Sequence, residues 1–283
     1  MKTAENKKRI IRTAVLFLLF AILVSFVIWI TWGNKALVLT EIQVSDERIP
    51  DGFSGYRIAQ ISDLHNTEFG KDNEKLLGLI EDADPDVIVV TGDVIDARRT
   101  DVDVAVTFLE GAVNIAPCYY VTGNHEERMP VDTAVLTEKM EKIGVAVLDN
   151  EAVKLSCGSD EITLIGLPDY SYDDSALTDN LSRLVSDGYD VTLSHRPDHI
   201  YDYSYCKADL VLCGHVHGGQ ARLPFIGGLF GPGQGFFPEY SEGLYTVDDT
   251  SMIVSRGLGN SIFPFRINNR PEVVLVILER AED

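Results

Sequence analysis

Basic residues are scarce in this chain, which has 24 Lys and Arg against 44 Asp and Glu and a formal net charge of −20. The first twelve residues hold five of these basic residues, so the remainder has 19 basic against 43 acidic residues and a net charge of −24. Such a body repels the phosphates of nucleic acids and anionic bilayer surfaces. The charge therefore argues against a nucleic-acid partner, and solubility alone is the plainer interpretation of the acidity.

Cysteine is also rare, and none of the four cysteines forms a Cys-x-x-Cys pair. This spacing argues against a structural zinc site of that kind. Cys118 and Cys213 lie in apolar runs, where a buried free thiol is the default. An even count still permits one or two disulfides that include Cys157 and Cys206, and the sequence does not decide. Internal repeats and low-complexity stretches are absent too, and 283 residues suffice for one large domain or two small ones.

One long uncharged segment contrasts with these absences, because no charge occurs in the 20 residues from Thr13 to Trp32. That length spans the hydrocarbon core of a bilayer as a helix. The segment is longer than the apolar part of a signal peptide, and Trp29 and Trp32 at its end suit an interfacial aromatic belt. We therefore expect a transmembrane anchor at 13–32, with export after signal cleavage as the alternative.

The charges that flank this segment predict its orientation. Residues 1–12 have a local balance of +4, whereas only Lys35 follows the segment closely. The positive-inside rule then places a basic tail, 1–12, in the cytoplasm. The expected arrangement is a single-pass protein of the cell membrane whose main domain, 36–283, lies outside the cytoplasm.

Short apolar runs, several of them separated by helical patterns, make up the body. Helices are expected near 71–82, 102–113, 132–142 and 174–187. Strands are expected at 36–44, 56–62, 86–90, 118–121, 144–148, 152–156, 161–166, 190–194, 209–213, 251–255 and 272–278. Repeated strand–helix–strand units predict parallel pairing with helices outside, and the later strands without intervening helices predict a second, partly antiparallel sheet. The expected fold is a layered α/β sandwich in one domain.

Residues 220–240 differ from the rest of the body. They are rich in Gly, Pro and Phe and show no periodicity. A loop of this length is often functional. The segment is either a surface loop that packs its own aromatic side chains or a lid that faces a substrate or a membrane, and the sequence favours neither.

The polar residues of chemical interest follow directly after expected strands. They form five clusters, namely Asp63 and His65, Asp93 and Asp96, Asn124 to Glu126, His195, and His215 with His217. Because the carboxyl ends of parallel strands meet at one edge of a sheet, these clusters can converge. The chain has six histidines, and only His199 lies outside the clusters. Histidines with ordinary roles in a core or on a surface would not occur so consistently at the ends of strands.

The residue types in these clusters suit a pair of metal ions. Asp63 and His65 are two apart, so in extended chain their side chains leave on the same face, and the pair at 215 and 217 repeats this spacing. Asp93 offers a carboxylate that can bridge two ions. The seven candidate ligands are Asp63, His65, Asp93, Asn124, His195, His215 and His217. Mixed nitrogen and oxygen ligation without thiolate suits Mn²⁺, Fe²⁺ or Fe³⁺, or Zn²⁺, and does not choose among them.

Two divalent ions about 3.5–4 Å apart convert a bridging water to hydroxide near neutral pH and stabilise an in-line transition state. A leaving alkoxide needs a proton, and His125 is the best-placed donor. Asp96 or Glu126 can orient this imidazole and keep it protonated, although either is equally suited to be a cap or an outer hydrogen-bond partner. We further expect that glycines at 92, 123 and 214 let the chain turn sharply at the strand ends.

At these residues the chain resembles a calcineurin-like metallophosphoesterase, whose pattern is D-x-H, G-D-x-x-D, G-N-H-[DE], a lone His and G-H-x-H. All five blocks are present in this order over residues 56–219. The resemblance implies a four-layer α/β/β/α sandwich of two mixed sheets flanked by helices. It implies two ligand sets, which are Asp63, His65, Asp93 and His217 on one metal, and Asp93, Asn124, His195 and His215 on the other. It also implies that His125 is the catalytic acid or a transition-state stabiliser.

The run from Gly214 to Gln220, the following Arg-Leu-Pro and the segment 255–259 resemble one bacterial branch of that family with an amino-terminal export or anchor segment. Asp96, however, is followed by Ala-Arg-Arg rather than by the Arg-Gly of familiar protein phosphatases. This difference weakens an inference to phosphoprotein substrates. Arg256 and Arg266 can bind a phosphate, but the favoured interpretation is that each forms an ion pair at the surface.

The sequence thus predicts a metal-dependent hydrolase of phosphomonoesters or phosphodiesters. Phospholipid headgroups, glycerophosphodiesters and lipid-linked pyrophosphates are candidate substrates, because an anchor would hold the site near the bilayer. The main alternative is a catalytically silent metal-binding scaffold, although such relatives usually lose ligands or the catalytic histidine. A nuclease fits poorly with the net charge of −24. The oligomeric state is open.

Overall fold

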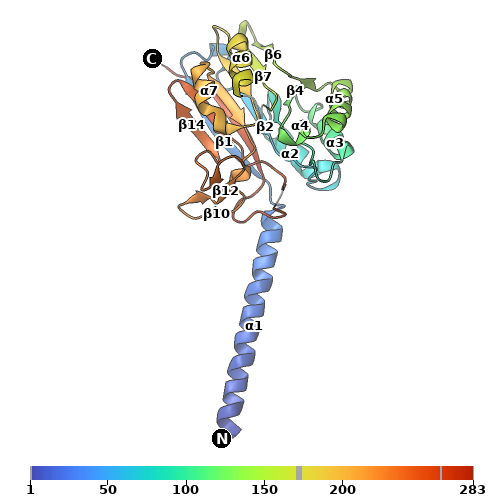
Figure 1. Cartoon of the computed structure of the whole chain (residues 1–283), viewed down its shortest axis with the longest axis vertical. Helices are drawn as coiled ribbons and strands as arrows, with labels where there is room; N and C mark the ends of the chain where they lie inside the picture. Colours follow the sequence, from blue (N-terminus) through green and yellow to red (C-terminus); the bar gives the residue numbers. More distant parts are fainter. Residues whose placement is uncertain (1, 170–173, 262, 283) are drawn as a thin grey trace.

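The computed structural model describes residues 2–169, 174–261 and 263–282. One long helix, α1 (Lys2–Gly33), projects from the end of a body built of two six-stranded sheets and their flanking helices (Figure 1). The segment expected to cross a membrane lies within α1. By length and composition this helix can cross a membrane, and none of its most apolar stretch is buried against the body.

The first sheet contains the strands that precede the first three clusters. Its strands, in spatial order, are β1 (Val38–Asp46), β16 (Glu272–Arg280), β2 (Arg57–Ile61), β3 (Val87–Thr91), β4 (Cys118–Val121) and β5 (Ala146–Val147). Strands β2 to β5 are parallel, as the strand–helix alternation predicts. The last strand, β16, lies between β1 and β2 and is antiparallel to β2, an insertion that the local sequence pattern does not indicate.

The second sheet contains the strands that precede the other two clusters. Its spatial order is β14 (Gly243–Val247), β15 (Thr250–Val254), β9 (Leu210–Cys213), β8 (Asp190–Leu193), β7 (Asp160–Gly166) and β6 (Glu151–Cys157). The four inner strands are parallel, and both edge strands are antiparallel. The expectation of a second, partly antiparallel sheet is confirmed.

Helices cover the outer face of each sheet. The first sheet is covered by α2 (Glu74–Asp82), α3 (Val102–Ala112) and α5 (Pro130–Ile143), and the second by α6 (Asp174–Leu184) and α7 (Ile200–Tyr205). Short helical turns are η1 (Asp51–Phe53), η2 (Lys71–Asn73), α4 (Asn124–Glu127), η3 (Pro197–His199) and η4 (His217–Gly219). These elements make the four layers of an α/β/β/α sandwich, and the expected fold class is confirmed.

Alternation along β3 shows how the sequence encodes two cores. Ile88 and Val90 pack in the cluster under α2, α3 and α5, whereas Val87 and Val89 pack in the cluster between the two sheets. A strand buried on both faces has no polar side, which is why this run is wholly apolar. All four cysteines are free thiols, so the possibility of disulfides is not realised.

The segment after β9 folds into two small hairpins at the end of the body from which α1 projects (Figure 1). They are formed by β10 (Arg222–Leu223) with β11 (Gly227–Gly228), and by β12 (Phe230–Gly231) with β13 (Gly235–Phe236). The rings of Phe230 and Phe236 meet edge to face, with centroids 5.5 Å apart. The segment expected to be a long loop is therefore an ordered pair of hairpins.

Candidate metal centre and active site

The five clusters come together where the carboxyl ends of five parallel strands meet. Strands β2, β3 and β4 are neighbours in the first sheet, and β8 and β9 are neighbours in the second. Every candidate ligand is buried, with exposed fractions of 5% or less for Asp63, His65, Asp93, Asn124, His195, His215 and His217. The structure thus brings together residues that the sequence separates by up to slightly more than half the chain.

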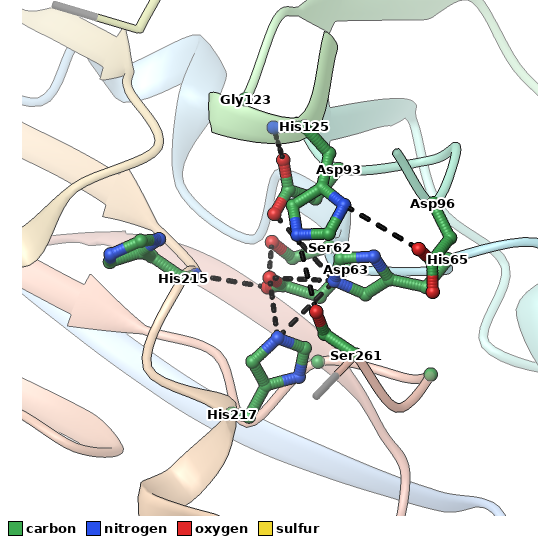
Figure 2. A network of polar contacts seen from close by, with 12 residues as sticks. Ser62, Asp63, His65, Asp93, Asp96, Gly123, His125, His215, His217 and Ser261 are labelled. Atoms are coloured by element: carbon green, nitrogen blue, oxygen red, sulfur yellow. Dashed lines mark hydrogen bonds and ion pairs between the residues drawn. The ribbon is translucent and has the colours of Figure 1, made fainter. Parts of the chain in front are cut away.

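Asp63, His65 and His217 form the first group, in which nitrogen and oxygen atoms point toward one another (Figure 2). The Nε2 atoms of His65 and His217 are 3.2 Å apart. Oδ1 of Asp63 lies 3.4 Å from Nε2 of His217 and 3.7 Å from Nε2 of His65. Three ligand atoms at these separations surround a space of the size that one cation takes.

Asp93, His195 and His215 form the second group. Oδ2 of Asp93 and Nδ1 of His215 each lie 3.2 Å from Nε2 of His195. Nδ1 of His195 is 2.7 Å from the carbonyl oxygen of Thr91, which turns Nε2 toward the other two side chains. The same Oδ2 of Asp93 is 3.6 Å from Nε2 of His65, so Asp93 lies between the two groups.

The donor atoms fit divalent cations. Oδ1 of Asp63 and Oδ1 of Asn124 are buried and have no hydrogen-bond partner among the described residues. Oδ2 of Asp63, in contrast, accepts from the hydroxyl of Ser62 and from the main-chain N–H of His215. A buried oxygen without a partner is costly, and a bound cation removes that cost. Imidazole and carboxylate donors without thiolate match the expected class of metal.

Burial and neighbouring charges set the protonation of the histidines. Burial, opposed by attraction to Asp63, lowers the pKa of His217 to about 3, so this imidazole is neutral at neutral pH. Burial likewise lowers the pKa of His215. Burial opposes a positive charge at His195 too, but attraction to Asp93 prevails and raises its pKa to about 10. The carboxylate of Asp93 therefore stabilises a positive charge at this point, whether a proton or a metal ion carries it.

His125 lies at the edge of the two groups, and its ring centroid is 4.5 Å from that of His65. Nδ1 of His125 accepts a hydrogen bond of 2.9 Å from the main-chain N–H of Ala97. The carboxylate of Asp96 is 3.9 Å from the same nitrogen and accepts from the N–H of Arg98 instead. Because Nδ1 is an acceptor, the ring proton is on Nε2, which lies 3.2 Å from the hydroxyl of Ser261.

Glu126 fixes the loops rather than the imidazole. Its carboxylate accepts from the main-chain N–H groups of Asp93, Ile95 and Gly123, at 2.8 to 3.0 Å. Burial and repulsion from Asp93 raise the pKa of Glu126 to about 7 despite these bonds. The alternative in which Glu126 orients His125 is wrong, because both carboxylate oxygens of Glu126 accept from main-chain N–H groups instead. The sequence pattern gives no sign of these bonds.

The backbone at the ligands differs from the expected extended chain. Asp63, His65, His215 and His217 all have positive φ, between 46° and 72°. Asp63 and His65 converge through left-handed backbone conformations, whereas His215 and His217 point into different donor groups, so extended alternation is the wrong explanation for both pairs. Each such residue costs on the order of 1 kcal/mol or more, which the surrounding contacts must offset.

The glycines at the strand ends serve two purposes. Gly92 has φ of 88°, so it permits the expected turn. A Cβ on Gly214 would lie 1.8 Å from the hydroxyl oxygen of Ser62 and 2.4 Å from Oδ2 of Asp63, and one on Gly123 would lie 2.3 Å from Oδ1 of Asp93. Gly123 and Gly214 are therefore required because carboxylates pack directly against the backbone.

Two arginines complete the surroundings of the histidines. Arg266 is 2% exposed, and its Nη2 lies 3.3 Å from Nδ1 of His217, so the expectation of a surface ion pair is wrong for this residue. Arg196 pairs with Asp169 and has Nη1 3.4 Å from Nε2 of His215. Arg196 follows a candidate ligand directly in sequence, which is the one signal that could have singled it out, whereas Arg266 has no such signal.

A pocket of about 110 Å³ opens onto these groups. Asp93, Asn124, His125, His215 and His217 contribute to its floor, and Arg128, Ser261, Gln220, Phe230, Pro232 and Phe263 contribute to its walls. Phe230 and Pro232, from the second hairpin, and Phe263, from the segment after β15, bring apolar surface to the metal groups. The site therefore combines a polar floor with a largely apolar rim.

The model of the calcineurin-like phosphoesterase family matches residues 56–219, which include all five clusters. The chain belongs to this family. It is 34% identical over 249 residues to the uncharacterized metallophosphoesterase YkuE of Bacillus subtilis, an alignment that covers 85% of each chain. It is 30% identical to the phosphodiesterase YaeI of Escherichia coli, over 81% of this chain and 84% of that protein.

Family membership and the buried donor groups together make this chain a metal-dependent phosphoester hydrolase. Its cofactors are divalent metal ions. A transmembrane protein with a metallophosphoesterase domain from Danio rerio is 26% identical over 86% of this chain and 57% of its own length. In the part of the chain that the structure describes, α1 is the helix with the length and apolar composition to cross a membrane.

Proposed function

We propose that this chain is a membrane-anchored phosphoesterase that uses two divalent ions to hydrolyse phosphomonoesters or phosphodiesters. Residues 1–12 form a cytoplasmic tail, 13–32 form the anchor, and 36–283 form a catalytic domain outside the cytoplasm. One ion is held by Asp63, His65, Asp93 and His217, and the other by Asp93, Asn124, His195 and His215. The observation that carries this proposal is the pair of buried donor groups with the carboxylate of Asp93 between them.

When bound, such ions lower the pKa of water and neutralise the negative charge of a phosphate. The chain's own part is to hold its donors in place before the substrate arrives. Asp63 is fixed by Ser62 and by the N–H of His215, and His195 is fixed by the carbonyl of Thr91. Donors fixed in this way need little reorganisation during the reaction.

His125 holds a proton where a leaving group needs one. The N–H of Ala97 occupies Nδ1, so Nε2 carries the proton and faces the pocket beside Ser261. Burial lowers the pKa of His125, although attraction to Asp93 and Asp96 opposes this, so the proton on Nε2 is the one that the ring holds. The role supported for His125 is that of a general acid toward the leaving oxygen.

The test uses the full chain in detergent, stripped with a chelator and reloaded with Mn²⁺. A panel of phosphomonoesters, phosphodiesters and pyrophosphates then shows which bonds are hydrolysed, and elemental analysis counts the ions. We expect two ions per chain and hydrolysis that depends on them. Two bound ions without turnover of any ester would instead indicate a silent scaffold. His199→Ala is the matched control, because it removes the one histidine outside the clusters.

A further inference from the structure

A second cavity adjoins the active-site pocket. It has a volume of about 200 Å³, and its described lining is glycine and apolar side chains apart from Gln220. Gln220, Phe230 and Phe263 line both spaces, so the apolar cavity and the pocket over the metal groups lie next to each other. A ligand with a phosphate at the metal groups therefore has an apolar space beside it.

Exposed aromatic side chains surround this part of the body. Phe225 is fully exposed, Phe236 is 72% exposed and Phe265 is 44% exposed, and Ile226 and Phe237 are exposed beside them. Single exposed apolar residues are ordinary, but a group on two adjacent hairpins is typical of an interaction surface. Because the body has a net charge of −24, attraction to an anionic surface does not explain the group, whereas apolar contact does.

The carboxyl end of α1 and the hairpins that contain β10 and β12 lie at the same end of the body (Figure 1). Oδ1 of Asn34, just after α1, accepts from the main-chain N–H of Arg266 at 2.8 Å and from Nδ2 of Asn260 at 3.0 Å. The segment between these two residues supplies Phe263 and Phe265 to the apolar cavity. The cavity is thus held next to the point where the chain leaves the anchor.

The junction also carries the features of a membrane interface. The guanidinium of Arg270 lies 5.3 Å from the ring centroid of Trp32, and its Nε donates to the carbonyl of Ala36. Tryptophan and arginine at the end of an apolar helix settle at the headgroup level. A helix end at that depth would place the hairpins, which lie at the same end of the body, close to the bilayer surface.

We infer that the substrate is a phosphoester carried by a membrane lipid, with its phosphate over the metal groups and the first part of its hydrocarbon chain in the apolar cavity. This inference rests on the proposed phosphoesterase function. The cavity is smaller than the roughly 300–1,000 Å³ of sites that enclose a whole ligand, so the rest of the chain stays in the bilayer. An apolar protein partner would cover the exposed hairpins but would not need a cavity adjacent to the catalytic pocket.

The test measures kcat/KM of the full chain, in one fixed detergent, on methyl, butyl, octyl and dodecyl esters of p-nitrophenyl phosphate. A second series of substrates consists of the phosphomonoesters of the same four alkyl groups. We expect kcat/KM to rise roughly four-fold for each methylene that becomes buried, and to level off once the cavity is filled. Hydrocarbon chains of membrane lipids are either fatty chains or isoprenoid chains. Comparison of esters with a fatty chain and esters with an isoprenoid chain then shows which kind the enzyme prefers.

Phe265→Ser places a hydroxyl in the cavity wall without touching the pocket over the metal groups. We expect the ratio of the dodecyl to the methyl kcat/KM to fall about ten-fold in this variant. Tyr205→Ser is the matched control, because Tyr205 is 80% exposed at the end of α7 and lines neither space. That variant should keep the wild-type ratio.

The outcomes separate the two proposals. Hydrolysis of the methyl esters without any gain from longer chains would overturn the lipid inference and leave the phosphoesterase proposal intact. An unchanged ratio in Phe265→Ser would equally overturn it, because the gain would then arise outside the cavity. Failure to hydrolyse any ester with both ions bound would overturn the proposed function itself.

Discussion

Asn34, the first residue beyond α1, is hydrogen-bonded to Arg266, whose guanidinium lies deep in the body. The main-chain N–H of Arg266 donates to Oδ1 of Asn34, and Nδ2 of Asn34 donates to the carbonyl of Arg266 at 3.0 Å. The side chain of Arg266 then reaches to 3.3 Å from Nδ1 of His217. A single residue therefore joins the end of α1 to a candidate metal ligand.

Replacement of Arg266 by methionine is expected to destabilise the body by about 3 kcal/mol. The guanidinium donates to the carbonyls of Gly259 and Arg256, and these buried acceptors would lose their partners. The measurement is the free energy of unfolding in denaturant, together with metal content. Arg183→Met, on the exposed side of α6, is the control and should stay within about 0.5 kcal/mol of wild type. Equal stability of the two variants would show that the buried guanidinium is not a structural requirement.

Loss of single ligands should distinguish the shared carboxylate from a ligand of one ion. Asp93→Asn is expected to lower the occupancy of both ions, because Asp93 lies between the two groups. His215→Ala should lower the occupancy of one ion and leave the other bound. Both variants should lose more than about 100-fold in kcat, beyond the range for residues that only orient ligands. Elemental analysis of the purified variants checks the count, and loss of a single ion in Asp93→Asn would contradict the shared role.

The location of the site could be predicted from the sequence because its determinants are local. Strands ending in Asp, Asn or His clusters can be recognised one at a time, and parallel pairing then brings their ends to one edge. The alternation of strands and helices also predicts the layers, since each strand carries its apolar pattern in its own residues. A layered sandwich and the meeting of the five clusters follow from these short-range signals, whereas the number of layers is implied by the resemblance to the family.

The remaining features depend on contacts between distant parts of the chain. Nothing in the sequence of β16 specifies that it inserts between β1 and β2, because a strand with an apolar centre can pair on either side. The bond from Ala97 to His125 depends on a main-chain N–H, which any residue type supplies. The positive φ of Asp63 and His65 is a tertiary constraint on residues that would locally prefer other conformations.

The role of His125 predicts a dependence on the leaving group. His125→Ala should keep both ions and lower kcat about 10²–10⁴-fold for alkyl esters, whose leaving oxygen needs a proton. The loss should be much smaller for p-nitrophenyl esters, because nitrophenolate leaves without protonation. Ser261→Ala is the matched control, since it removes the hydroxyl 3.2 Å from Nε2 but keeps the imidazole and its bond to Ala97. Equal losses on both classes of ester would assign His125 to binding of the phosphate instead.

Two glycine-to-alanine changes should have opposite effects for a steric reason. A Cβ on Gly214 would lie 1.8 Å from the hydroxyl oxygen of Ser62, so Gly214→Ala must displace the neighbour that fixes Asp63. We expect this variant to lose bound metal and hydrolysis together. Gly78, in α2, has open space around its Cβ position, so Gly78→Ala should stabilise the helix by about 0.5–1 kcal/mol and leave metal content unchanged. Thermal unfolding and elemental analysis measure both effects, and full metal content in Gly214→Ala would show that the backbone at this strand end can move away from Asp63.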